Sequence, residues 1–128
     1  MKVGIIGTRS RNEDCDKAEI LTVLQDILQR NVITTIVSGG AKKGGDRFAE
    51  DLAEEFELPT QIFYPKTFTT PGYLARNVLI AKHSDILVAC IDPEFNTIEQ
   101  IMKSKTGGTN FTVKEFLKHH SKKQLYLV

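Results

Sequence analysis

The stretch "DILVACI", residues 85–91, decides the fold, because it is an apolar run without alternation between polar and apolar residues. A strand of this composition is covered on both faces, which is typical of a parallel sheet flanked by helices. Other short apolar runs of strand length, rich in Val, Ile, Leu or aromatic residues, span residues 2–6, 33–37, 60–64 and 124–128. The chain therefore carries five candidate strands.

Segments with helical periodicity lie between these runs. Asp16 and Glu19 predict a capping box at the start of the first segment. Pro59 closes the second segment, and Thr70 with Pro71 predicts a cap followed by a first-turn proline for the third. The predicted helices cover residues 16–30, 48–56, 70–82 and 109–120, and the long polar connection 92–105 has room for a short helix.

The alternation of strands and helices predicts an α/β fold with a doubly wound parallel sheet, in one domain spanning residues 1–128. The apolar fraction of 41% and the charged fraction of 26% are typical of globular proteins. A net charge of +1 argues against binding of nucleic acid or membrane by the whole surface. No stretch is long enough to span a membrane and the N-terminus does not resemble a signal peptide, so we expect a cytoplasmic protein.

The two cysteines, Cys15 and Cys90, have neither metal-ligand spacing nor the pattern of a secreted disulfide framework. Cys90 lies in an apolar run and is interpreted as a small buried hydrophobe. We therefore expect neither a metal site nor a cofactor.

Glycine-rich or polar clusters follow the predicted strands. These clusters are residues 7–10, 38–46, 65–66 and Asp92, and a further cluster, 106–109, opens the last helix. In a doubly wound sheet, ligands bind outside the carboxyl ends of the strands, where the strand order reverses. The clustering therefore predicts a binding site at that edge.

Two of these clusters contain paired glycines that lead into a helix, in "VSGGAKKGGD" (37–46) and "TGGT" (106–109). Glycine lets backbone amides approach a ligand closely, and a helix N-terminus favours an anion, so the pattern points to phosphate. The spacing matches neither the Walker A motif nor G-x-G-x-x-G. Glycines that serve only tight turns and helix packing remain the alternative.

Taken together, "GIIGTRS", "VSGGAKKGGDRFAEDLA", "ARNVLIAKHSDILVACI" and "TGGTNFTVKEF" resemble the SLOG superfamily of Rossmann-like nucleotide-binding domains over almost the full chain. The resemblance implies a three-layer Rossmann-like sandwich with strand order 3-2-1-4-5. It also implies a nucleotide or nucleotide-derived ligand over the strand ends, and we expect a homodimer or a higher homo-oligomer.

Two groups within this resemblance suggest different functions. Arg76 matches the helix arginine of the LOG-type phosphoribohydrolases, which cleave the N-glycosidic bond of nucleoside monophosphates. The segment "TGGTNFTVKE" departs from their motif, because Thr106 replaces a proline, a third glycine is absent and Glu115 lies one residue late. The patterns "VSGGAKKGGD" and "ARNVLI" resemble the DNA-processing protein A group, which binds single-stranded DNA with a more basic surface and additional domains.

We therefore expect a protein that senses or sequesters a nucleotide-type small molecule. N-glycosidase activity, single-stranded nucleic-acid binding and a structural or interaction role are the alternatives. Arg9 and Arg76 are expected to hold a phosphate or a carboxylate, with structural salt bridges at the surface as the alternative. Asp46 is expected to cap its helix, with a ribose hydroxyl acceptor as the alternative, and Asp92 either closes a turn or contacts ribose or base. Glu115 is the candidate carboxylate, beside Arg76, if the protein is an enzyme. The full set of expected ligand-binding residues is Gly7, Thr8, Arg9, Ser38, Gly39, Gly40, Lys43, Asp46, Arg76, Asn77, Asp92, Gly107, Gly108 and Thr109.

Overall fold

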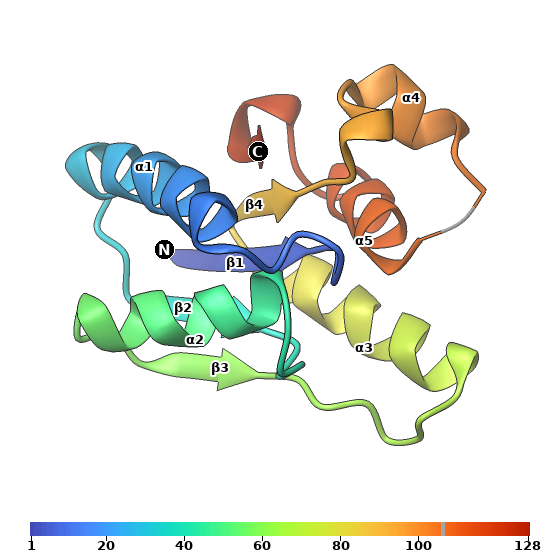
Figure 1. Ribbon diagram of the computed structural model, residues 1–128, viewed down its shortest axis with the longest axis horizontal. Helices are drawn as coiled ribbons and strands as arrows, with labels where there is room; N and C mark the ends of the chain where they lie inside the picture. Colours follow the sequence, from blue (N-terminus) through green and yellow to red (C-terminus); the bar gives the residue numbers. More distant parts are fainter. Residues whose placement is uncertain (106) are drawn as a thin grey trace.

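Five strands form one parallel sheet (Figure 1) in the structure, a computed structural model that describes residues 1–105 and 107–128. Thr106, with its place in the predicted cluster 106–109, lies outside the described residues. The sheet order is β3-β2-β1-β4-β5 and all neighbouring strands pair in parallel, which confirms the expected α/β class and strand order. The strands are β1 (Lys2–Gly7), β2 (Thr35–Ser38), β3 (Thr60–Ile62), β4 (Ile86–Cys90) and β5 (Leu125–Leu127).

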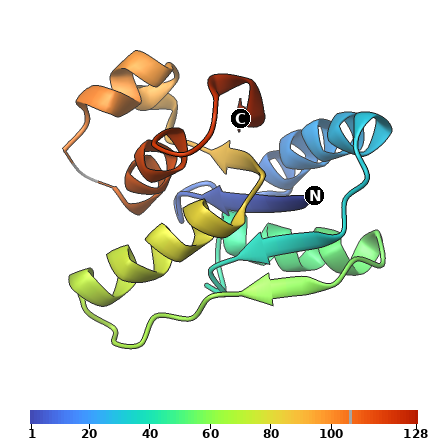
Figure 2. The same cartoon turned by 180° about the vertical axis from the view of Figure 1, so that it is seen from behind.

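Helices cover both faces of the sheet, which makes the fold a three-layer, Rossmann-like sandwich (Figures 1 and 2). One face carries α1 (Asp14–Arg30) and α2 (Gly45–Glu55). The other face carries α3 (Thr70–His83), α4 (Ile98–Lys103) and α5 (Gly108–Leu117). None of the described helices is long and apolar enough to cross a membrane.

The central strand β4 contributes side chains to both hydrophobic cores. Val88 and Cys90 pack against the core under α1 and α2, whereas Leu87 and Ala89 pack against the core under α3, α4 and α5. All four side chains are fully buried, so the interpretation of "DILVACI" as a strand covered on both faces is confirmed. Burial also raises the pKa of the Cys90 thiol to about 11, as expected for an inert cysteine.

Several predicted helix ends were wrong. The carboxylate of Asp16 accepts a hydrogen bond from the Glu13 N–H at 3.1 Å, so α1 begins at Asp14 and Glu19 takes no part in its cap. Thr69 caps α3 by accepting from the Gly72 N–H at 3.3 Å, which places Thr70 and Pro71 in the first turn. The helix α5 begins at Gly108 and ends at Leu117 instead of His120.

The polar connection between β4 and α5 does carry a short helix, α4, preceded by a 3₁₀ turn at Pro93–Phe95. The predicted strands agree with the observed ones to within one or two residues at each end. Since β1 lies between β2 and β4, the chain leaves β1 and β4 toward opposite faces of the sheet. This reversal of strand order opens a crevice at the carboxyl ends of β1 and β4, as in other doubly wound sheets.

Candidate functional site

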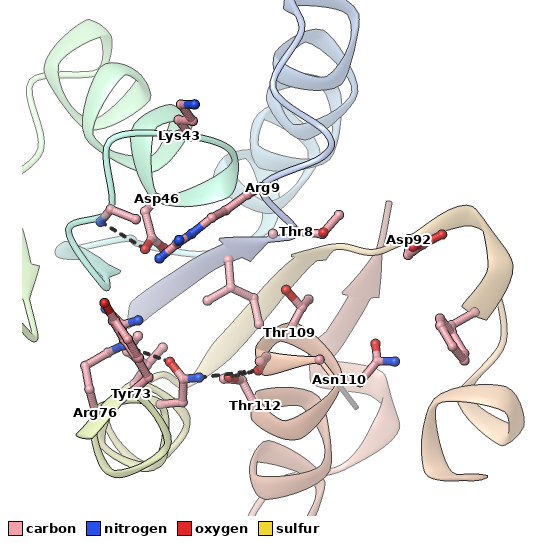
Figure 3. A pocket seen from close by; sticks show the side chains of 18 residues that line it. Thr8, Arg9, Lys43, Asp46, Tyr73, Arg76, Asp92, Thr109, Asn110 and Thr112 are labelled. Atoms are coloured by element: carbon pink, nitrogen blue, oxygen red, sulfur yellow. Dashed lines mark hydrogen bonds between the residues drawn. The ribbon is translucent and has the colours of Figure 1, made fainter. Parts of the chain in front are cut away.

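A cleft of about 520 Å³ lies at the carboxyl ends of β1 and β4 (Figure 3). Its walls come from the loops after β1, β2 and β4, from one side of α3 and from the N-terminal turn of α5. The expected site residues in its lining are Gly7, Thr8, Arg9, Lys43, Asp46, Arg76, Asn77, Asp92, Gly107, Gly108 and Thr109. The structure therefore brings together most of the residues that the sequence singled out.

Like Lys43, Arg9 is an exposed cation that lines the cleft. Its side chain extends from the loop after β1 and is exposed, and its guanidinium lies 6.0 Å from the centre of the Tyr73 ring. Among the described residues, Arg9 makes no hydrogen bond or ion pair. An arginine held only over an aromatic ring keeps its planar fork of N–H donors for an anionic ligand.

Arg76 is tied into the fold. It is 9% exposed, its Nε donates to the Asn77 side-chain oxygen at 2.8 Å, and its Nη1 donates to the Gly39 carbonyl at 2.5 Å. Burial lowers the pKa of Arg76, Asp46 opposes that shift and the positive charge of Arg9 adds to it. Arg76 thus connects α3 to the glycine-rich loop and contributes positive charge at the wall of the cleft.

Asp46 is the second residue of α2, and Gly44 is the N-cap, so the prediction that Asp46 caps this helix is wrong. Its carboxylate instead accepts a hydrogen bond from the Ala41 N–H at 3.1 Å (Figure 3). Burial raises the pKa of Asp46, against the backbone hydrogen bonds from Ala41 and Gly39 and the charges of Arg76 and Arg9. Asp46 therefore holds the glycine-rich loop from one side and Arg76 holds it from the other.

Ser38, Gly39 and Gly40 lie outside the lining of the cleft. Ser38 is fully buried, and its hydroxyl accepts from the Gly40 N–H at 3.3 Å. A Cβ at Gly39 would lie 2.5 Å from Arg76 Nη1 and 2.8 Å from Asp46 Oδ2. These residues therefore determine the conformation of the loop and leave space for the Arg76 guanidinium. This agrees with the alternative in which the glycines serve tight turns and packing.

Gly44 and Gly45 place α2 against β1. Gly44 has a φ of 70°, a conformation that favours glycine, and its N–H donates to the Asn12 side-chain oxygen at 2.8 Å. A Cβ at Gly45 would overlap the backbone of Ile6 and Gly7. The second glycine pair of "VSGGAKKGGD" therefore allows the close approach of a helix to a strand.

The N-terminal turn of α5 faces the same cleft. The first three N–H groups of an α-helix have no partner within the helix, and in α5 these belong to Gly108, Thr109 and Asn110, all of which line the cleft. Gly107 precedes them with a φ of 98°, and a Cβ there would meet no atom of the described residues within 4 Å, its chain neighbours aside. The end of the helix is thus open to a ligand, and its partial positive charge favours an anion.

Sequence reasoning missed several residues of the cleft. Tyr73 lies one turn before Arg76 on α3, so helical spacing could have found it once Arg76 was chosen. Thr112 donates to the Gly108 carbonyl at 2.7 Å, and Asn110 donates to the Ser104 hydroxyl at 3.1 Å. The residues missed were Ile6, Ala41, Tyr73, Ile80, Phe95, Asn110 and Thr112.

The carboxylates that line the cleft are Asp46 and Asp92. Asp92 lies across the cleft from Asp46 and Arg9 (Figure 3), and one of its carboxylate oxygens accepts from the Glu94 N–H at 3.0 Å, which supports the turn interpretation. Glu115 is not part of the lining and pairs at 2.7 Å with Lys118, the residue that follows the last residue of α5. Among residues 1–105 and 107–128, no three His, Cys, Asp or Glu side chains are placed to hold a metal ion.

Fold and cleft together define a Rossmann-like α/β fold with a cleft at the point where the strand order reverses. Comparison with known proteins finds no matching family model, no matching curated protein and no matching solved structure. The site is therefore interpreted from its own chemistry.

Proposed function

We propose that the protein binds a nucleotide or a nucleotide-derived phosphate compound in the cleft at the carboxyl ends of β1 and β4. The observation that carries the proposal is that the N-terminal turn of α5 lines one cleft together with Arg9, which has no hydrogen-bond or ion-pair partner among the described residues. Backbone N–H groups at a helix end and an arginine fork both favour phosphate. The resemblance of the glycine-rich motifs to the SLOG superfamily supports the same ligand class.

The rest of the cleft suits the neutral part of such a ligand. Tyr73 and Phe95 provide aromatic surface, and Asn110 and Asp92 provide polar groups for ribose hydroxyls or base edges. Small-molecule sites commonly combine such apolar walls with a few convergent polar groups, in volumes of roughly 300–1,000 Å³. The volume of about 520 Å³ agrees with that range.

We propose binding without turnover, because the carboxylate that the hydrolase alternative requires is displaced. Glu115 is paired with Lys118 outside the cleft, so it lacks the position of a general base toward a ribose in the cleft. Incubation with AMP and other nucleoside monophosphates, followed by chromatography, tests this point. Release of free base and ribose 5-phosphate would contradict the proposal and restore the N-glycosidase.

A thermal-shift screen with nucleoside monophosphates, NAD, ADP-ribose and cyclic nucleotides tests binding itself. A ligand at a hundredfold excess over its Kd is expected to stabilise the fold by about 2.7 kcal/mol. Arg9→Ala is expected to weaken binding by about 10–100-fold, because a hydrogen bond to a charged group contributes roughly 1.5–3 kcal/mol. The melting temperature without ligand should stay unchanged, since Arg9 is exposed.

Arg30→Ala is the matched control. Arg30 is exposed on α1, pairs with Asp26 at 3.2 Å and lies outside the cleft. An equal loss of affinity from both substitutions would indicate a nonspecific charge effect. The absence of a shift with every nucleotide in the screen would contradict the proposed function.

A further inference from the structure

A second groove, of about 430 Å³, lies between α3 and α5, which run side by side on one face of the sheet (Figures 1 and 2). Thr70, Tyr73 and Leu74 line it from α3, and Phe111 and Lys114 line it from α5. Neither the fold nor the proposed phosphate site accounts for this groove.

The groove and the cleft share a wall. Tyr73, Asn77, Gly107 and Gly108 line both spaces. Within this wall, the Asn77 side-chain amide of α3 donates to the Gly108 carbonyl of α5 at 3.4 Å. Apart from the chain neighbours of Gly107, no atom of the described residues lies within 4 Å of a Cβ built on this glycine. The two spaces are therefore adjacent, and a ligand that extends beyond the cleft would reach the groove along this wall.

The chemistry of the groove matches a second aromatic, anionic unit. Tyr73, Phe111 and Leu74 are only partly buried and offer apolar surface on which a base can stack. The Lys114 ammonium donates to the Ser104 carbonyl and keeps further donors for a phosphate. Among the described lining residues of the groove, the charged side chains are all lysines.

We propose that the groove holds the second half of a dinucleotide-type ligand. One nucleotide unit occupies the cleft, and the other places its base against Tyr73, Leu74 and Phe111 and its phosphate near Lys114. This inference rests on the proposed function and specifies the ligand class of the same site. Each space by itself falls within the range of roughly 300–1,000 Å³ common for small-molecule sites.

Isothermal titration calorimetry tests the inference with matched pairs of ligands. The mononucleotides AMP, GMP, CMP and UMP are compared with NAD and with linear 5′-phosphorylated dinucleotides of the same bases. At least one dinucleotide is expected to bind tenfold or more tightly than its own 5′-mononucleotide. The gain comes from stacking and charge contacts in the groove.

The substitution Leu74→Glu places a negative charge in the groove without touching the cleft. It is expected to reduce the affinity for the dinucleotide to that for the mononucleotide and to leave the mononucleotide affinity unchanged. Val78→Glu is the matched control, because Val78 lies one turn further along α3, is 37% exposed and lines neither space. It should leave both affinities unchanged.

Thermal melting checks the fold of each variant, and Lys114→Met, which removes the charge and keeps the apolar stem, serves if Leu74→Glu does not fold. Equal binding of mononucleotides and dinucleotides would overturn the inference and leave the proposed function intact. So would a loss of affinity for both ligands in Leu74→Glu. An affinity that rises another tenfold with a decanucleotide would overturn it in favour of strand binding, and no binding of any nucleotide would overturn both proposals.

Discussion

Asp46 and Arg76 show how single charged residues can serve the fold and the cleft at once. Both line the cleft, yet Arg76 donates to the Gly39 carbonyl and Asp46 accepts from the Ala41 N–H. The glycine-rich loop is thus held by two side chains of opposite charge. A charge in such a position is desolvated, so its ionisation is linked to the stability of the fold.

The stability of the folded chain is therefore expected to depend on the protonation of Asp46. Burial raises its pKa above the ordinary value of 3.8, so the folded state holds this proton more tightly than the unfolded state. The contribution of Asp46 to the free energy of unfolding is then largest at low pH. It falls as pH rises from about 3.8 through the higher pKa of the folded state.

Asp46→Asn removes this titration and keeps an oxygen that can accept from Ala41. Urea denaturation of both proteins from about pH 3.5 to 7 gives the difference in free energy of unfolding, variant minus wild type. We expect that difference to grow with pH. Any pH-independent cost of the asparagine shifts the whole curve and leaves its slope unchanged, so a flat difference would contradict the prediction.

At the scale of elements, the glycines of residues 37–46 determine how α2 meets the sheet. Gly40 and Gly44 have positive φ values of 77° and 70°. Gly45 lets the first turn of α2 contact the backbone at the end of β1. Since β1 also carries the loop with Arg9, the fit of α2 against β1 positions one wall of the cleft.

Gly45→Ala is expected to destabilise the fold by about 3 kcal/mol, at the upper end of the cost of overpacking, because the added Cβ would overlap backbone atoms that cannot rotate away. Gly107→Ala is the comparison. Its Cβ would meet no atom of the described residues within 4 Å, its chain neighbours aside, so the expected cost is that of the φ of 98°, about 1–2 kcal/mol. Urea denaturation measures both, and an equal cost would contradict the packing role of Gly45.

For the whole molecule, one sheet joins two hydrophobic cores. The strands β1 and β4 send neighbouring side chains to opposite faces, as Ile5 and Ile6 show. The core under α1 and α2 contains Leu24, and the core under α3, α4 and α5 contains Phe116, both fully buried. Both hydrophobic cores are built on the same strands, so loss of the sheet would expose the two cores together.

The two layers are therefore expected to unfold in one cooperative transition. Leu24→Ala should cost about 2–5 kcal/mol and Phe116→Ala about 3–5 kcal/mol, each shifting the same single transition. Far-UV circular dichroism and tyrosine fluorescence should give coincident urea curves for the wild type and for both variants. Separate transitions, with each variant moving only one of them, would contradict this coupling.

Much of the fold could be predicted from the chain alone, because burial on both faces of a strand leaves an uninterrupted apolar run and a half-buried helix leaves a stripe. Residues 85–91 show the first pattern and residues 16–30 the second. The strand order followed from the resemblance of the glycine-rich motifs, and Arg9 and Gly108 were found in the cleft because they follow strands or open a helix. Whether a residue follows a strand or begins a helix depends on its place along the chain, which can be read directly from the sequence.

Only the tertiary structure decided which of the glycines and charges face the cleft. Ser38, Gly39 and Gly40 were expected to bind the ligand, yet they lie outside the lining of the cleft. Asp46 was expected to cap α2, yet its carboxylate holds the glycine-rich loop. Tyr73 lines the cleft because α3, which packs beside α5, is rotated about its own axis so that this side chain faces the cleft. The direction of a side chain depends on such rotations and on backbone contacts between elements far apart in the chain, and spacing along a sequence does not contain them.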